Sequence, residues 1–138
     1  MTKDKSQEIV LEDCFNYVEI QSDYMRNLVV NVLSIIQESL DLDKIDFDSI
    51  REGATFSGEC AEITGDGDIT LDSKMLSQYD DIVAMAILAH EFAHFYLDHY
   101  GKHPEGLEFE EEADEQAKKW GFDVDKFRKV CGQDTISF

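Results

Sequence analysis

The stretch Ile82–His94, IVAMAILAHEFAH, decides how this chain can fold. Apolar residues fill every position from Ile82 to Ala89, so a helix built from them is apolar on all sides. This composition is typical of a central helix that is packed on both flanks. The sequence predicts that this helix runs from about Gln78 or Asp80 to Tyr100, with Gly101 as its C-cap.

The last five residues of that stretch have the pattern His-Glu-x-x-His. On a helix, His90 and His94 lie one turn apart and can both offer imidazole nitrogens to a single metal ion. Glu91 lies at the rim of such a site, where its carboxylate can take a proton from a metal-bound water. The five residues alone suggest this chemistry, and their context has to support it.

Composition bounds the class of protein. The 138 residues are expected to form one domain, 1–138, with 31 acidic and 12 basic side chains and a net charge of −19. Such a charge repels phosphate backbones and anionic lipid, which argues against nucleic acid or membranes as partners. It suits a soluble protein, or one that attracts basic substrates. Three widely spaced cysteines, Cys14, Cys60 and Cys131, predict reduced thiols in a cytoplasmic protein.

The expected fold class is α+β. Apolar residues at three- and four-residue steps from Met25 to Leu40 predict an N-terminal amphipathic helix, capped by Ser22 or Asp23. Residues 41–51 are expected to be a loop with at most a short strand. Two strands are expected around 55–63 and 68–71, with a glycine turn between them. Helices are expected at about 107–120 and 124–130.

A third metal ligand has to come from elsewhere in the chain. Tyr100 stands six residues after His94, where one class of metallopeptidases has a third histidine, so that solution is excluded. His99 lies about 180° around the helix from His90. His103 follows Gly101 and remains a minor candidate.

The acidic stretch in the helix expected at 107–120 supplies a better ligand. One face of this helix combines two carboxylates, Glu110 and Asp114, with Ala113, Ala117 and Trp120. Carboxylates on an apolar face are costly unless each meets a cation, a metal or a hydrogen-bond donor. We therefore expect Glu110 to be the third ligand and Asp114 to accept a hydrogen bond from a ligand histidine. Two histidines and one carboxylate favour zinc.

With both motifs in place, the chain resembles gluzincin metallopeptidases. These combine His-Glu-x-x-His on one helix with Glu-x-x-x-Asp on the next, as in His90–His94 and Glu110–Asp114. Residues 90–99 and 110–122 are similar to the catalytic core of CAAX prenyl protease relatives, and the lack of membrane helices favours small minigluzincins. The similarity covers about a third of the chain.

The resemblance implies a zinc-dependent peptidase. It implies that His90, His94 and Glu110 bind zinc, that Glu91 is the general base, and that Asp114 orients a ligand. It also implies a zincin-like domain with a small, mostly antiparallel sheet, whose edge strand binds extended peptide. Asp68–Asp72 is the segment expected in that role.

Several points stay open. Tyr96, His99, Tyr100 and His103 are candidate donors to the oxyanion, and the sequence does not choose among them. One alternative is a latent or regulatory protease, either repressor-cleaving or inhibited by its own tail, Gly132–Phe138, through Cys131 or Asp134. Another is a non-catalytic binding module that keeps zinc for stability.

Overall fold

A computed structural model of the chain describes residues 11–40, 47–55, 59–64, 67–97 and 107–131. In chain order its elements are α1 (Leu11–Cys14), β1 (Phe15–Glu19), α2 (Asp23–Leu40), β2 (Phe47–Glu52), β3 (Ala61–Ile63), β4 (Asp68–Leu71), α3 (Ser73–Leu76), α4 (Asp81–Tyr96), α5 (Leu107–Trp120) and α6 (Val124–Cys131). The α+β class expected from the sequence is therefore confirmed.

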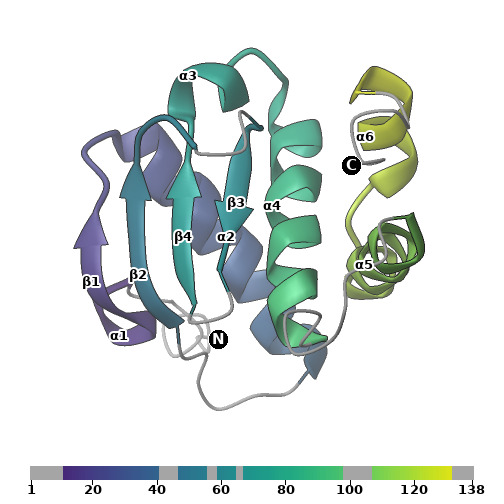
Figure 1. The fold of residues 1–138 in the computed structure, drawn as a ribbon, viewed down its shortest axis with the longest axis horizontal. Helices are drawn as coiled ribbons and strands as arrows, with labels where there is room; N and C mark the ends of the chain where they lie inside the picture. The colour runs from purple at the N-terminus through teal and green to yellow at the C-terminus, as the bar shows by residue number, and fades with distance from the viewer. Residues whose placement is uncertain (1–10, 41–46, 56–58, 65–66, 98–106, 132–138) are drawn as a thin grey trace, which may run out of the picture.

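The sheet is mixed, with strand order β1-β2-β4-β3 (Figure 1). β1 pairs with β2 and β2 with β4 in parallel, and only β3 and β4 are antiparallel. The expectation of a mostly antiparallel sheet is wrong. Parallel neighbours need a crossover connection, and here the helix α2 provides it between β1 and β2.

The expected edge strand is also placed differently. β4, which contains Asp68 to Leu71, is paired on both sides, so it is not an edge. The edge beside α4 is β3, which is shorter than the strand expected from residue 55 onward. Gly67 makes the tight turn between the two strands with a φ of +90°, a conformation that favours glycine.

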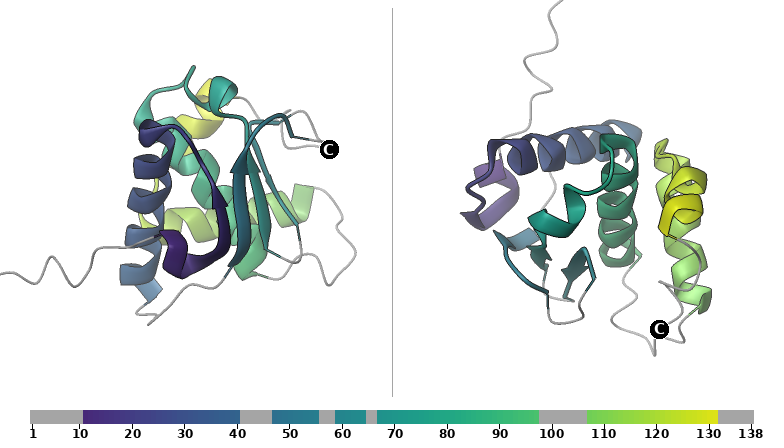
Figure 2. Two further views of the ribbon diagram at one scale, coloured as in Figure 1. Left: turned by 90° about the vertical axis from the view of Figure 1, so that its left-hand side faces the viewer. Right: turned by 90° about the horizontal axis from the view of Figure 1, so that it is seen from above.

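Helices cover one side of the sheet, as the view from above shows (Figure 2). α2 and α4 pack against one another, and α5 and α6 pack on the outer side of α4. Aromatic rings pack between the sheet and α4. The ring of Phe47 on β2 stacks on that of Phe15, with ring centres 5.2 Å apart, and its centre lies 5.2 Å from that of Phe92 and 5.1 Å from that of Phe95. The centre of the molecule is thus built around α4.

Local signals set the ends of these helices. Ser22 Oγ accepts the Met25 N–H at 3.1 Å, which confirms one of the two expected caps of α2. Asp80 caps α4 by accepting the Val83 N–H at 3.0 Å. α4 ends at Tyr96, before the predicted end at Tyr100. Tyr100 and the expected C-cap Gly101 lie outside the described ranges.

α4 is buried on nearly all sides, as its apolar sequence predicts. Ala84, Ala86, Ala89 and Ala93 have no exposed surface. Within the described ranges, no helix combines the length and the apolar character needed to cross a bilayer.

Candidate metal centre

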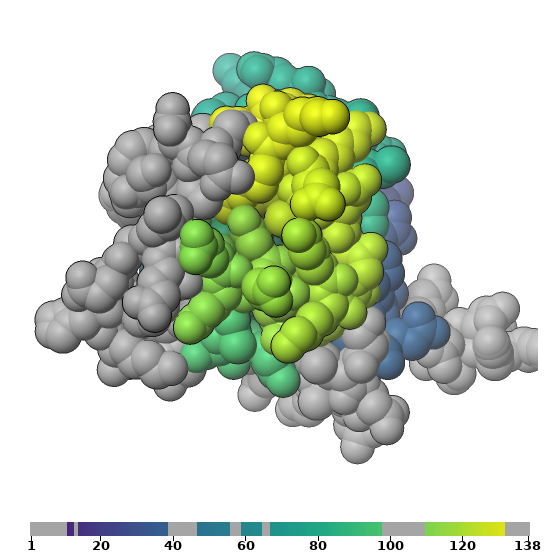
Figure 3. Space-filling model, turned by 90° about the vertical axis from the view of Figure 1, so that its right-hand side faces the viewer, coloured from purple at the N-terminus to yellow at the C-terminus, as the bar shows by residue number. Residues whose placement is uncertain are grey.

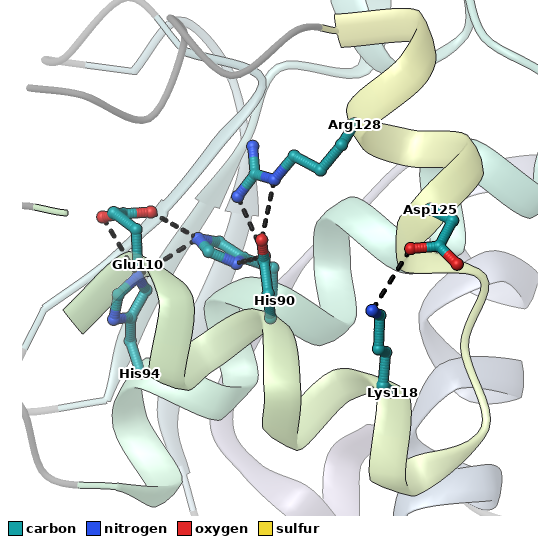
Figure 4. A network of polar contacts seen from close by, with 7 residues as sticks. His90, His94, Glu110, Lys118, Asp125 and Arg128 are labelled. Carbon is teal, nitrogen blue, oxygen red and sulfur yellow. Dashed lines mark hydrogen bonds and ion pairs between the residues drawn. The ribbon is translucent and has the colours of Figure 1, made fainter. Parts of the chain in front are cut away.

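The expected ligands come together between α4 and α5. His90 and His94 project from α4, and Glu110 faces them from the first half of α5 (Figure 4). One ligand atom from each lies within 4.8 Å of the other two, so the group could hold a metal ion. His90 and His94 are only 3% and 9% exposed.

The spacing of these atoms fits a tetrahedral ion. Metal–ligand bonds of about 2.0–2.1 Å at tetrahedral angles place ligand atoms about 3.4 Å apart. His90 Nε2 lies 3.2 Å from His94 Nε2, and His94 Nε2 lies 3.4 Å from Glu110 Oε2. The third separation, from His90 Nε2 to Glu110 Oε1, is 2.7 Å, a direct charge-assisted hydrogen bond. These contacts use different oxygens of Glu110, so they do not describe one triangle of ligand atoms. The two longer separations are close to the tetrahedral value, and the hydrogen bond between His90 and Glu110 would have to open for an ion to bind.

The packing of α5 on α4 explains why the carboxylate reaches the histidines. Ala113 and Ala117 have no exposed surface, so α5 can approach α4 closely. Trp120 is 4% exposed at the end of the same face. The opposite face of α5 is exposed to solvent and carries Glu111, Glu112, Glu115, Lys118 and Lys119. The division of α5 into an inward and an outward face is therefore confirmed.

Asp114 lies behind His90, as expected from its position one turn after Glu110. Its Oδ1 accepts the His90 Nδ1–H at 2.9 Å. This hydrogen bond leaves His90 Nε2 for a metal and fixes the orientation of the ring.

Arg128 on α6 completes the group, and it is not among the residues expected from the sequence. Its Nε donates to Asp114 Oδ2 and its Nη2 donates to Asp114 Oδ1, each at 2.9 Å. Its guanidinium also lies 4.1 Å from the centre of the Phe127 ring. Arg128 is 8% exposed, and within the described residues its Nη1 has no hydrogen-bond partner. A forked donor pair to one carboxylate holds Asp114 in one orientation.

Charge coupling shapes the pKa values of this group. Burial alone would lower the pKa of His90, but the hydrogen bonds to Asp114 and Glu110 raise it to about 9. For Glu110, burial acts to raise the pKa, and the hydrogen bonds from His90 and His94 outweigh it and lower the pKa to about 2. Burial also acts to raise the pKa of Asp114, and the hydrogen bonds from His90 and Arg128 outweigh it and lower that pKa. The metal-free centre is therefore an imidazolium held by two carboxylates.

Glu91 lies in a different environment. Burial raises its pKa to about 8, the neighbouring His90 opposes the rise, and Glu59, Glu110 and Glu62 add to it. Glu91 is thus a half-buried carboxyl group next to His90, one of the candidate metal ligands. A bound cation would favour its ionised form.

The remaining candidates are less central. The ring of Tyr96 contacts Trp120, at the other end of α5 from Glu110, with ring centres 5.6 Å apart. His99, Tyr100 and His103 lie outside the described residues, as do the tail 132–138 and Asp134. Cys131 is the last residue of α6 and is half-buried.

Helices α5 and α6 make up much of one face of the molecule (Figure 3). Comparison of the chain with protein-family models, with curated proteins and with solved structures gives no match.

Proposed function

We propose that this chain is a zinc-dependent peptidase of the gluzincin type. The observation that carries the proposal is the arrangement of His90, His94 and Glu110, with near-tetrahedral spacing and with Asp114 behind His90. Three protein ligands of this kind leave a fourth position for water or substrate, as in catalytic zinc sites. A purely structural zinc site usually has four protein ligands and no such opening.

The donor set also favours zinc over harder ions. Two imidazole nitrogens suit zinc and other transition metals, whereas calcium and magnesium prefer oxygen ligands. When bound, zinc supplies a Lewis acid that polarises a carbonyl and lowers the pKa of water toward neutrality.

Glu91 is the residue we assign to proton transfer. It follows His90 directly on α4, and the charges of His90 and Glu110 both act electrostatically on its carboxyl group. As a carboxylate it takes the proton of the attacking water, and as a carboxylic acid it passes that proton to the leaving amine. In the metal-free chain burial raises the pKa of Glu91 to about 8, and a bound cation would lower that pKa toward the range in which the carboxylate acts as a base at neutral pH.

Asp114 and Arg128 position the site without touching the substrate in this account. The Asp114 carboxylate holds His90 Nδ1, and Arg128 holds both oxygens of that carboxylate. The chain Arg128–Asp114–His90 thus links α6, α5 and α4 at one ligand. Such supports typically change metal affinity or activity by about 10–100-fold.

Extended peptide is the substrate form that fits this fold. β4 is paired on both sides, so among the described strands the free edges for a substrate strand are β1 and β3, and β3 is the one that packs against α4. Glu59 lies just before β3 and Glu62 lies in it, and both act electrostatically on Glu91. Together with the net charge of −19 they favour peptides with basic residues.

The test compares turnover with metal content. Zinc-loaded protein is incubated with a quenched peptide library that contains basic and acidic members, and bound zinc is measured by elemental analysis. Glu91→Gln should lower turnover by about 10²–10⁴-fold, the usual contribution of a general base, and should keep one zinc per chain. Glu110→Gln should lose both turnover and zinc.

Glu111→Gln is the matched control, because it removes the same charge from an exposed neighbour on α5. If wild type binds zinc and cleaves no peptide, the peptidase proposal fails and a non-catalytic binding module remains. If cleavage appears only after removal of residues 132–138, the chain is a latent protease inhibited by its tail.

A further inference from the structure

One more side chain of α6 lies against the candidate ligand His90. The ring of Phe127 packs on the His90 imidazole, with ring centres 5.8 Å apart and an angle of 68° between the ring planes. Steeply tilted rings at this separation are a favoured geometry of aromatic pairs. Both side chains are buried, so the contact is shielded from water.

The neighbours of Phe127 on α6 orient that helix. Lys126 Nζ donates to Asp80 Oδ2 at 2.8 Å, and Asp80 is the N-cap of α4. On the other side of Phe127 in the sequence, Arg128 donates to Asp114 on α5. The position of the Phe127 ring is therefore set by contacts of α6 with both neighbouring helices.

Phe127 is also held by a cation. The Arg128 guanidinium lies 4.1 Å from the centre of the Phe127 ring, within the range of cation–π attraction. Figure 4 shows the Arg128 side chain extending from α6 toward His90 and its neighbours. Arg128, Phe127 and His90 thus form a continuous series of contacts from α6 to α4.

The contact matters because of the way in which a histidine ring is held. The torsion that turns the ring about its bond to the rest of the side chain is soft. Asp114 fixes one ring atom of His90, Nδ1, and leaves the plane of the ring to its packing neighbours. One neighbour is the ring of His94, whose centre lies 4.7 Å away at an interplanar angle of 87°. His94 is itself a candidate ligand, so Phe127 holds the His90 ring from outside the ligand set.

We propose that Phe127 is a positioning residue of the metal centre, whose ring holds the plane of the His90 imidazole so that Nε2 faces the ion. The inference rests on the metal site of the proposed function. It adds a second support of His90 from α6, beside the one that Arg128 provides through Asp114. Two adjacent residues of α6 then set the orientation of one ligand, although neither of them is a ligand.

The first test measures zinc affinity of the full-length chain by competition with a chelator. Phe127→Leu keeps a buried apolar side chain and removes the ring. It should bind zinc about three- to tenfold more weakly than wild type, the effect expected from the loss of one aromatic pair. Phe127→Tyr keeps the ring and should restore most of this affinity.

Phe122→Leu is the matched control, because Phe122 is also buried and lies between α5 and α6. This variant loses a similar apolar contact area and should keep the zinc affinity of wild type. The inference is overturned if Phe127→Leu binds zinc as tightly as Phe122→Leu does.

A second measurement needs neither zinc nor turnover, and it decides the matter even if Phe127→Leu does not fold. In NMR spectra of the metal-free wild-type chain, ring protons of Phe127 should show nuclear Overhauser effects to ring protons of His90. Their absence would overturn the contact and the inference with it. A wild-type chain that binds zinc and cleaves no peptide would instead refute only the peptidase proposal.

Discussion

The support of His90 offers a sharp test of how the metal centre is built. Asp114→Asn keeps the size of the side chain and removes its charge. In the wild type the carboxylate accepts one hydrogen bond from His90 and two from Arg128, each at 2.9 Å. An amide has one oxygen and one donor group, so it cannot satisfy all three donors. The replacement therefore leaves a buried N–H group without an acceptor.

The expected loss can be worked out from these contacts. His90 no longer has a charged acceptor at Nδ1, so the ring is a weaker ligand and its orientation is less fixed. Removing such a support usually weakens metal binding by about 10–100-fold, which is about 1.4–2.7 kcal/mol. We expect the zinc dissociation constant of Asp114→Asn to rise by that factor.

The assay is a competition titration with a zinc chelator of known affinity at pH 7.5. Glu115→Gln is the control, because it removes the same charge from the exposed neighbouring position. The control should bind zinc as wild type does. The reasoning is refuted if Asp114→Asn binds zinc within twofold of wild type while remaining folded by circular dichroism.

The same contacts give four further predictions. Zinc affinity should rise about tenfold per pH unit between about pH 6.5 and 9 and then level off, because below its pKa of about 9 His90 has to release a proton to bind the ion. In the metal-free chain, the stability that the His90 imidazolium contributes should be fully present below about pH 6.5 and should be lost as the pH rises through 9. Denaturant titrations at several pH values would detect this loss. Arg128→Gln should weaken zinc binding less than Asp114→Asn does, because Asp114 still accepts the hydrogen bond of His90. An equal loss of zinc affinity in the two variants would contradict this order. Ala117→Leu should lower the free energy of unfolding by about 1–3 kcal/mol, because Ala117 has no exposed surface and no room for a larger side chain, and an unchanged melting curve would contradict the close packing of α5 on α4.

The two helices of the metal centre could be predicted because their signals are local. The apolar run before His90 fixes the buried position of α4, and the three- and four-residue steps of α5 separate its inward carboxylates from its exposed ones. The spacing of Glu110 and Asp114 on one face then brings both to α4. Each of these inferences needs only the geometry of a single helix.

The sheet could not be predicted in the same way, because its pairing depends on contacts between distant segments. β1, Phe15–Glu19, has only one fully buried residue and gives no alternating pattern. β2, Phe47–Glu52, is acidic around its apolar residues and was expected to be mostly loop. The insertion of β4 between β2 and β3 has no local signal, so the edge position was assigned to the wrong strand.

Arg128 was missed although a signal for it exists. A carboxylate on the apolar face of α5 requires a cation or donors, and Asp114 has more oxygen atoms than His90 can satisfy. On α6, Val124, Phe127 and Arg128 fall on one face at helical spacing, which places an arginine among buried residues. Matching the unpaired cation to the unpaired carboxylate would have found the contact.

The most direct test of the central claim is the position of zinc in the zinc-loaded protein. We predict a single strong peak in anomalous diffraction at the zinc edge, about 2.0–2.2 Å from His90 Nε2, His94 Nε2 and a Glu110 oxygen. A peak at any other site, or a Glu110 side chain turned away from both imidazole rings, would contradict the account.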